Sequence, residues 1–295
     1  MEKVYVFATT EREAGVAQSF DALAPASLAG KRTLVKPNFN TADPTPGSTH
    51  HDTLSAILDG ARRRNPKALA VGDRSAPETA GVLREKGVHA LASAYEAEVL
   101  DFDLLPEGDW IHFDPPGSHW PEGFRIARPV LETDYLVWSP CLKPHQFGGV
   151  FTMSLKLAVG VVPRRGYPYM TQLHQSPHQR KMIAEINPPF CPDLIILDGV
   201  TAFTDGGPAE GTRKDLGIFI AGRDRIAVDA VGLAALKHAG TKPEIADVPI
   251  FAQEQLARAI DLGLGITGPE DIDLIAGDDG SRDITASLQT ILASG

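Results

Sequence analysis

The chain has 295 residues, of which 43% are hydrophobic and 22% charged, so a packed globular core is expected and a disordered chain is excluded. Its net charge of -10 argues against a general nucleic-acid-binding surface, which needs an excess of Lys and Arg to replace counterions. No apolar run reaches membrane-spanning length, and residues 1–10 are typical of a strand rather than a signal peptide. The two cysteines, Cys141 and Cys191, suggest no disulfide framework, so we expect a cytoplasmic protein without nucleic-acid or membrane partners.

Seven short runs of β-branched and aliphatic residues predict strands. Most are continuous rather than alternating, as expected for strands that are buried on both faces. Each run ends at a turn or polar residue. The runs cover residues 4–7, 33–35, 68–71, 135–138, 194–197, 217–220 and 272–275.

Helical patterns lie between these strands. Residues 49–52 fit a capping box that opens an amphipathic helix, with Asp52 in the position usually held by Glu. Asp224 is expected to cap a helix that stops at Gly240. Further helices are predicted over residues 82–95 with a break near Gly87, over 177–186 and over 250–262. This alternation predicts a single α/β domain over residues 1–295, built on a mostly parallel sheet with helices on both faces.

The segment 104–122 interrupts this pattern. It carries four prolines and two glycines, together with His112, His119 and Trp120. Such a composition disfavours regular helices and central strands. We expect an irregular insertion or a flap.

Chemically active side chains cluster where the predicted strands end. Ligands of parallel sheets bind beyond the carboxyl ends of the strands, so these side chains can meet in one cleft although they are distant in sequence. They are Lys36, Asn38, Asp73, Lys143, His145 and Asp198.

Three lysines have unusual settings. Lys36 and Lys143 each precede a proline, which enforces an extended backbone, and Lys156 lies inside an apolar run. If they converge, their ammonium groups would bind a carboxylate or a phosphate. The alternative, of comparable weight, is a solvated surface lysine at each position.

The histidines allow two roles. His50 and His51 would lie in the first turn of a helix, where the dipole favours a neutral imidazole that can act as a base or a metal ligand. His145 and His174 flank the apolar run. Imidazole combined with carboxylate suits iron, zinc, nickel or manganese, so His50, His51, Asp73 and His145 are candidate metal ligands. The alternative, slightly favoured, is acid–base work by the same histidines without a metal.

The glycine pair Gly206 and Gly207 follows the strand that carries Asp198. Successive backbone amides in such a loop can form a nest for an anion, and the alternative is a turn that needs positive φ. The chain has no P-loop, no dinucleotide-binding glycine motif and no nucleophile elbow.

Several short motifs together resemble the domain of unknown function 362 family. They lie between about Thr33 and Asp229 and comprise residues 35–38, 72–73, 140–145, 154–156, His174, 192–194, 197–199, 206–208 and 227–230. The resemblance implies an α/β domain that some relatives join to an iron–sulfur ferredoxin module. This chain departs from those relatives, because two cysteines cannot supply the four thiolates of an ordinary cluster. It also has Leu157 where the family pattern has Asn.

The leading functional hypothesis is an enzyme acting on a small anionic substrate. The expected binding groups are Lys36, Asn38, Lys143, Gly206 and Gly207, and the expected catalytic groups are His145, His174, Lys156 and Asp198. The resemblance to this family, some of whose members carry an iron–sulfur module, slightly favours redox chemistry. Two alternatives remain: a carrier of a metal or metabolite that uses the same cleft without turnover, and a cluster-free partner in an electron-transfer assembly.

Overall fold

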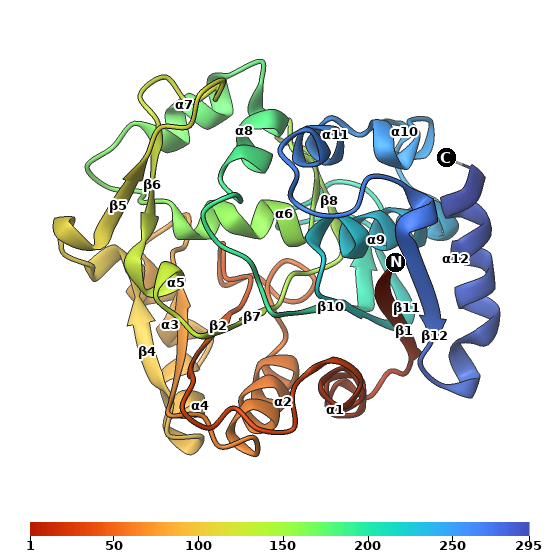
Figure 1. Ribbon diagram of the computed structural model, residues 1–295, viewed down its shortest axis with the longest axis horizontal. Helices are drawn as coiled ribbons and strands as arrows, with labels where there is room; N and C mark the ends of the chain where they lie inside the picture. Colours follow the sequence, from red (N-terminus) through yellow and green to blue (C-terminus); the bar gives the residue numbers. More distant parts are fainter. Residues whose placement is uncertain (295) are drawn as a thin grey trace.

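The computed structural model describes residues 1–294 and contains an eight-stranded mixed sheet between two layers of helices (Figure 1). Seven strands are parallel to one another, and only β11 runs against its two neighbours. The predicted α/β class with a mostly parallel sheet is confirmed. In spatial order the strands are β12 (Ile272–Ala276), β1 (Glu2–Ala8), β11 (Arg213–Gly222), β10 (Leu194–Phe203), β7 (Tyr135–Trp138), β2 (Arg32–Lys36), β3 (Ala68–Asp73) and β4 (Glu98–Asp101).

Two hydrophobic cores lie on opposite faces of the sheet, because successive side chains of a strand point to opposite sides. Leu34 belongs to one core and its neighbour Val35 to the other. One face is covered by α1 (Arg12–Leu23), α2 (His51–Arg62), α3 (Thr79–Glu85) and α4 (Val88–Ala94), and the other mainly by α6 (Ser154–Leu157), α8 (Gln179–Glu185), α9 (Arg225–Ala239), α11 (Glu254–Asp261) and α12 (Arg282–Ser294) (Figure 1).

The remaining elements are short. Two antiparallel hairpins pair β5 (Trp110–Phe113) with β6 (Phe124–Ala127) and β8 (Lys143–His145) with β9 (Val150–Thr152). The other helices are α5 (Arg128–Leu131), α7 (Tyr169–Gln175) and α10 (Pro243–Ala246). Single 3₁₀ turns are η1 (Phe102–Leu104), η2 (Glu107–Asp109), η3 (Ala158–Val161), η4 (Ile250–Ala252), η5 (Pro269–Asp271) and η6 (Asp279–Ser281). No helix within residues 1–294 is both long and apolar enough to cross a membrane.

The local helix signals succeed at two boundaries and fail at a third. The Asp224 side chain accepts a hydrogen bond from the Ala227 amide, and Gly240 follows the last residue of α9, as predicted. The predicted capping residue Thr49 does not cap α2, because the His50 ring does so by accepting the Asp52 amide hydrogen. The Thr49 hydroxyl instead accepts from the backbone amide of Asn38, 2.8 Å away.

The Pro-rich segment 104–122 is held against the rest of the molecule. It contains β5 and a buried Trp120, whose indole N–H donates to the Met182 carbonyl of α8 at 3.0 Å. The buried carboxylate of Glu185 accepts hydrogen bonds from His119 and from Arg258. These contacts fix the segment on α8 and α11.

Candidate anion-binding site

A cavity of about 420 Å³ opens beyond the carboxyl ends of β2 and β3, where the β8–β9 hairpin, α6, η3 and α7 meet. Strand β2 ends at Lys36, since Pro37 follows it and lacks a backbone N–H, whereas Lys143 begins β8, which continues through Pro144 to His145. The polar lining residues are Lys36, Asn38, Asn40, Asp73, Arg74, Lys143, His145, Thr152, Lys156, Arg164 and His174. The other lining residues are Ala76, Phe147, Leu157, Val159, Gly160, Met170 and Pro208.

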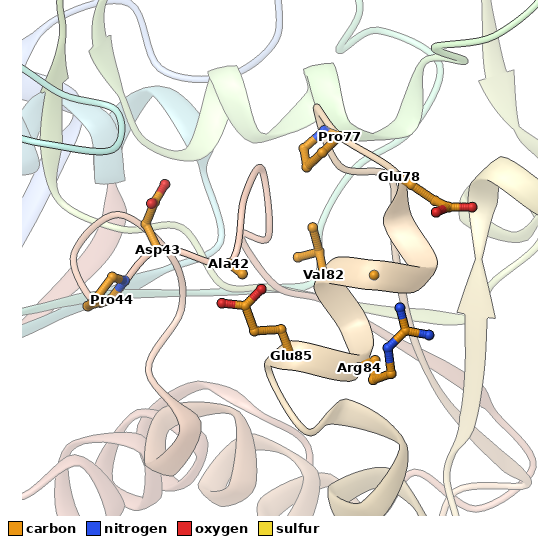
Figure 2. A pocket seen from close by; sticks show the side chains of 9 residues that line it. Ala42, Asp43, Pro44, Pro77, Glu78, Val82, Arg84 and Glu85 are labelled. Atoms are coloured by element: carbon orange, nitrogen blue, oxygen red, sulfur yellow. The ribbon is translucent and has the colours of Figure 1, made fainter.

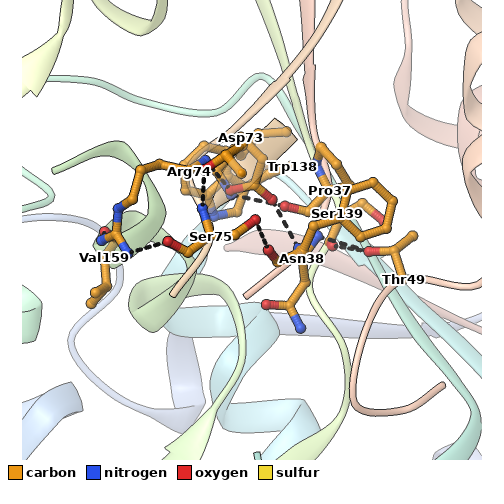
Figure 3. Close-up of polar contacts among 12 residues, drawn as sticks. Pro37, Asn38, Thr49, Asp73, Arg74, Ser75, Trp138, Ser139 and Val159 are labelled. Atoms are coloured by element: carbon orange, nitrogen blue, oxygen red, sulfur yellow. Dashed lines mark hydrogen bonds and ion pairs between the residues drawn. The ribbon is translucent and has the colours of Figure 1, made fainter. Parts of the chain in front are cut away.

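Lys36 and Asp73 form a fully buried ion pair at the base of the cavity. Their Nζ and Oδ1 atoms lie 2.6 Å apart, and each side chain is 1% exposed. The Asp73 carboxylate also accepts the backbone amides of Phe39 and Arg74, as Figure 3 shows for the contacts around Asp73. Burial lowers the pKa of Lys36, and the Asp73 carboxylate opposes that shift. This pair organises the floor of the cavity and leaves Asp73 without a free oxygen for a metal.

Lys143 is completely buried and has no carboxylate partner among the described residues. Its Nζ donates to the Gly47 carbonyl at 2.5 Å. The Asn38 side-chain amide points to the same carbonyl at 3.5 Å. Burial lowers the pKa of Lys143 to about 8, against the influence of Cys141 and Asp43. Two of its three ammonium hydrogens remain available to a ligand.

Lys156 projects from α6 and makes neither an ion pair nor a hydrogen bond to any residue of the described chain. The start of α6 is anchored by the buried Asp229, which accepts the amides of Ser154 and Leu155 at 2.6 and 2.9 Å. Burial, reinforced by the charges of Lys143 and Arg74, lowers the pKa of Lys156 to about 7. Asp229 therefore positions an amine that is partly neutral at physiological pH.

Arg74 adds a third cation without a carboxylate partner in the described chain. Its guanidinium donates to the backbone carbonyls of Val159 and Val162 and so holds η3 over the Lys36–Asp73 pair (Figure 3). Burial lowers its pKa to about 10, which leaves it protonated at neutral pH. Sequence reasoning missed this residue; its one signal is its place directly after Asp73 at a strand end.

His145 and His174 line the cavity. His145 is 4% exposed, its Nδ1 has no hydrogen-bond partner, and burial together with Lys156 and Lys143 strongly lowers its pKa. His174 is exposed, and its Nδ1 lies 2.7 Å from the Met170 carbonyl. Because a carbonyl only accepts, Nδ1 of His174 donates this hydrogen bond.

The expectation that Asp198 shares this cleft is wrong. Its carboxylate accepts from Arg12 at 3.0 Å and from Thr53 at 2.6 Å, and Asp198 is not among the cavity-lining residues. The strand β10 continues through Asp198 to Phe203, so Asp198 lies within the strand and not at its end. Asp198 therefore stabilises the packing of α1 and α2 on the sheet.

The predicted metal ligands are not brought together. His50 and His51 lie at the start of α2 and do not line the cavity. Asp73 is saturated by Lys36 and two amides, and His145 faces lysines that repel a cation. Residues 1–294 contain no group of three or more His, Cys, Asp or Glu side chains with the spacing of a metal site. The donor set does not fit a divalent metal.

Gly206 and Gly207 form a turn and no free anion nest. The amide of Gly207 donates to the Glu210 carbonyl at 2.6 Å, and the next residue in the loop, Pro208, has no amide hydrogen. Both glycines have positive φ, 62° and 69°. A Cβ on Gly207 would lie 2.0 Å from the Pro144 carbonyl, so glycine permits the close approach that places Pro208 in the cavity wall.

Gly207→Ala is therefore expected to destabilise the protein by about 2–4 kcal/mol, from positive φ and from displacement of the β8 backbone. Gly117→Ala is the matched control, because its φ of 75° is similar and no atom lies within 4 Å of the added carbon. Urea unfolding should show the larger loss for Gly207→Ala. Equal losses would mean that the loop moves aside at no cost.

A second hollow, of about 610 Å³, lies beside α3 (Figure 2). Its charged lining residues are Asp43, Glu78, Glu85 and one cation, Arg84. This acidic excess disfavours an anion, and no lysine or histidine lines the hollow. This hollow therefore lacks the lysines and histidines that line the smaller cavity.

Comparisons with known proteins give one family and two distant likenesses. The family model described as "Domain of unknown function (DUF362)" matches residues 33–234. Thylakoid-associated protein sll1697 of Synechocystis sp. is 27% identical over 208 residues, which cover 68% of this chain and 62% of that protein, so this chain spans less than two thirds of that relative. The structure of the lactate racemase apoprotein from Thermoanaerobacterium thermosaccharolyticum matches 75% of this chain and 54% of that chain, with a TM-score of 0.41 and 15% identity. A likeness of this extent supports no inference about activity.

Proposed function

This chain belongs to the DUF362 family, and we propose that it is an enzyme that binds a small organic anion in the cavity and moves protons on it. One observation carries the proposal: Lys143 is fully buried and Lys156 partly buried, neither has a carboxylate partner within residues 1–294, and both line the same cavity. Burying ammonium groups without a counter-charge is unfavourable. A bound anion would supply that counter-charge. Although the protein has a net charge of -10, none of its acidic side chains within residues 1–294 forms a salt bridge with either lysine.

The cavity wall favours an organic carboxylate over inorganic phosphate. Phe147, Leu157 and Met170 line it together with the cationic side chains. An anion with a short carbon skeleton can contact both surfaces, and an inorganic ion can contact only one. A volume of about 420 Å³ lies at the lower end of the range for small-molecule sites, which limits the substrate to a small molecule.

The side chains divide into binding and proton-transfer groups. Lys143 and the charge of Arg74 would hold the carboxylate, with the Asn38 amide beside Lys143. Lys156, with a pKa of about 7, suits general acid–base catalysis, because a catalytic pKa near the working pH is the most effective. The unpartnered Nδ1 of His145 and the His174 ring can form hydrogen bonds with the substrate. These groups favour proton transfer over the redox chemistry that the family resemblance suggested.

Small carboxylates are expected to raise the melting temperature of the wild-type protein and to have no such effect on Lys143→Met. A ligand at a hundred times its Kd stabilises by about 2.7 kcal/mol, enough for a clear shift. Lys67→Met is the control, since Lys67 is exposed and remote from the cavity. An equal shift in all three proteins would place the anion outside the cavity.

Hydrogen exchange separates an enzyme from a carrier. If the chain moves protons on its ligand, carbon-bound hydrogens of the ligand should exchange with deuterium in heavy water, and the exchange should disappear in Lys156→Met. Binding without exchange across the stabilising carboxylates would support the carrier hypothesis.

A further inference from the structure

We infer that Lys156 is a nucleophile that forms an imine with the carbonyl group of an oxo acid bound in this cavity. The inference rests on the proposed function and specifies its substrate class. Among the three cavity lysines, the contacts leave only Lys156 free to react.

Two of the three amines are held in place. Lys36 Nζ lies 2.6 Å from Asp73 Oδ1 and donates to the Pro37 carbonyl at 2.8 Å. Lys143 is fully buried and donates to the Gly47 carbonyl. Lys156 has no polar partner within residues 1–294 and is partly exposed along the cavity wall. An amine that attacks a carbonyl carbon needs this freedom, because its lone pair must point at the substrate.

A glycine brings the Lys156 side chain next to an imidazole. A Cβ on Gly149 would lie 2.9 Å from His145 Nδ1 and 3.0 Å from Lys156 Cε. The two side chains therefore converge on the same point of the β8–β9 turn, and the missing side chain leaves them room. His145 Nδ1 is buried and has no hydrogen-bond partner within residues 1–294, so it is available for a hydrogen bond with the amine or the substrate.

The neighbouring cations fit an oxo acid. Lys143 and Arg74 are close enough to Lys156 to lower its pKa, and burial does so more strongly, to about 7. A lysine that is desolvated and placed beside other cations is activated as a nucleophile. The same cations would bind the carboxylate of a 2-oxo acid, whose carbonyl carbon is directly bonded to that carboxylate.

The bonding change is balanced without an oxidant or reductant. The neutral amine adds to the carbonyl carbon, which forms a C–N bond and a hydroxyl group. The hydroxyl then leaves as water with both amine hydrogens, and a C=N bond remains. The imine withdraws electrons from the adjacent carbon and so eases loss of a proton from it, which is the reaction class proposed above.

Reductive trapping tests this inference on the full chain. The protein is incubated at pH 7 with glyoxylate, pyruvate or 2-oxobutanoate together with cyanoborohydride, which converts the imine into a stable secondary amine. Peptide mass mapping should find the adduct on Lys156 with at least one of these acids, at a rate about tenfold or more above that of the exposed Lys67. Excess acetate, which has a carboxylate and no carbonyl, should slow the labelling of Lys156 and leave Lys67 unchanged.

Lys156→Arg keeps the positive charge and should lose the adduct while small carboxylates still raise its melting temperature. Labelling of Lys156 no faster than that of Lys67 with all three acids, in protein that acetate still stabilises, would overturn the imine and leave the anion site standing. If no carboxylate stabilises the wild-type protein, the proposed function itself fails.

Discussion

Asp73→Ala is expected to lower the free energy of unfolding by about 3–5 kcal/mol, the usual loss when one partner of a buried ion pair is removed. Lys36 would then keep its charge without a counter-ion or lose its proton, and both outcomes are unfavourable for a side chain that is 1% exposed. The amides of Phe39 and Arg74 would also lose their acceptor. Urea unfolding measures this loss. If the slope of the unfolding free energy against urea concentration is unchanged, the substitution alters stability alone.

The double variant Lys36→Met/Asp73→Leu is the matched control for this loss. It removes both charges and keeps apolar volume, so most of the stability should return, as it does when a buried pair is replaced by hydrophobic residues. A loss below about 1 kcal/mol for Asp73→Ala would show that the pair is solvated in solution. The Lys36–Asp73 pair would then not form a buried floor of the cavity.

Acetate binding is expected to weaken as pH rises from 6 to 9, by at least about tenfold for each cavity lysine whose charge the anion needs. The ammonium form exists below the pKa, which is about 7 for Lys156 and about 8 for Lys143, so the positive charge disappears within this window. Acetate itself stays ionised throughout, because its carboxyl titrates well below pH 6. Calorimetric titration at several pH values measures the effect.

The stability of the ligand-free protein should change in the opposite sense. Both lysines have lowered pKa values in the folded state and ordinary values near 10.5 when unfolded, so the unfolded state binds more protons between about pH 7 and 10. Their contribution to the free energy of unfolding therefore rises with pH. Lys156→Met should reduce both trends, and acetate affinity that does not depend on pH would contradict the assignment of these two lysines.

The strand ends explain why part of the site could be predicted. Buried aliphatic runs identified β2, β3 and β7 from local sequence, and parallel strands bring their carboxyl ends together. Lys36 and Asp73 therefore meet although they are far apart in the chain. The hairpin that carries Lys143 and His145 was not predicted, but both side chains reach the same cavity from it.

The misplacement of Asp198 and the omission of Arg74 and Gly149 have physical reasons. The strand containing Asp198 continues for five residues beyond it, to Phe203, and Asp198 shares the side of β10 that carries Ile196 and Val200, which faces α1 and α2. A turn signal at Gly199 could not reveal that continuation. The contributions of Arg74 and Gly149 depend on which backbone carbonyls and side chains lie opposite them, and that follows only from the tertiary packing.

The central claim is that Lys143 binds the carboxylate of a small organic anion in the cavity, beside Lys156. A crystal structure of the protein saturated with pyruvate tests it most directly. We predict a carboxylate oxygen about 2.7–2.9 Å from Nζ of Lys143, the usual distance for a charged hydrogen bond, and the carbonyl carbon of pyruvate next to Nζ of Lys156. An empty cavity at a pyruvate concentration that stabilises the protein, or pyruvate bound only outside the cavity, would contradict it.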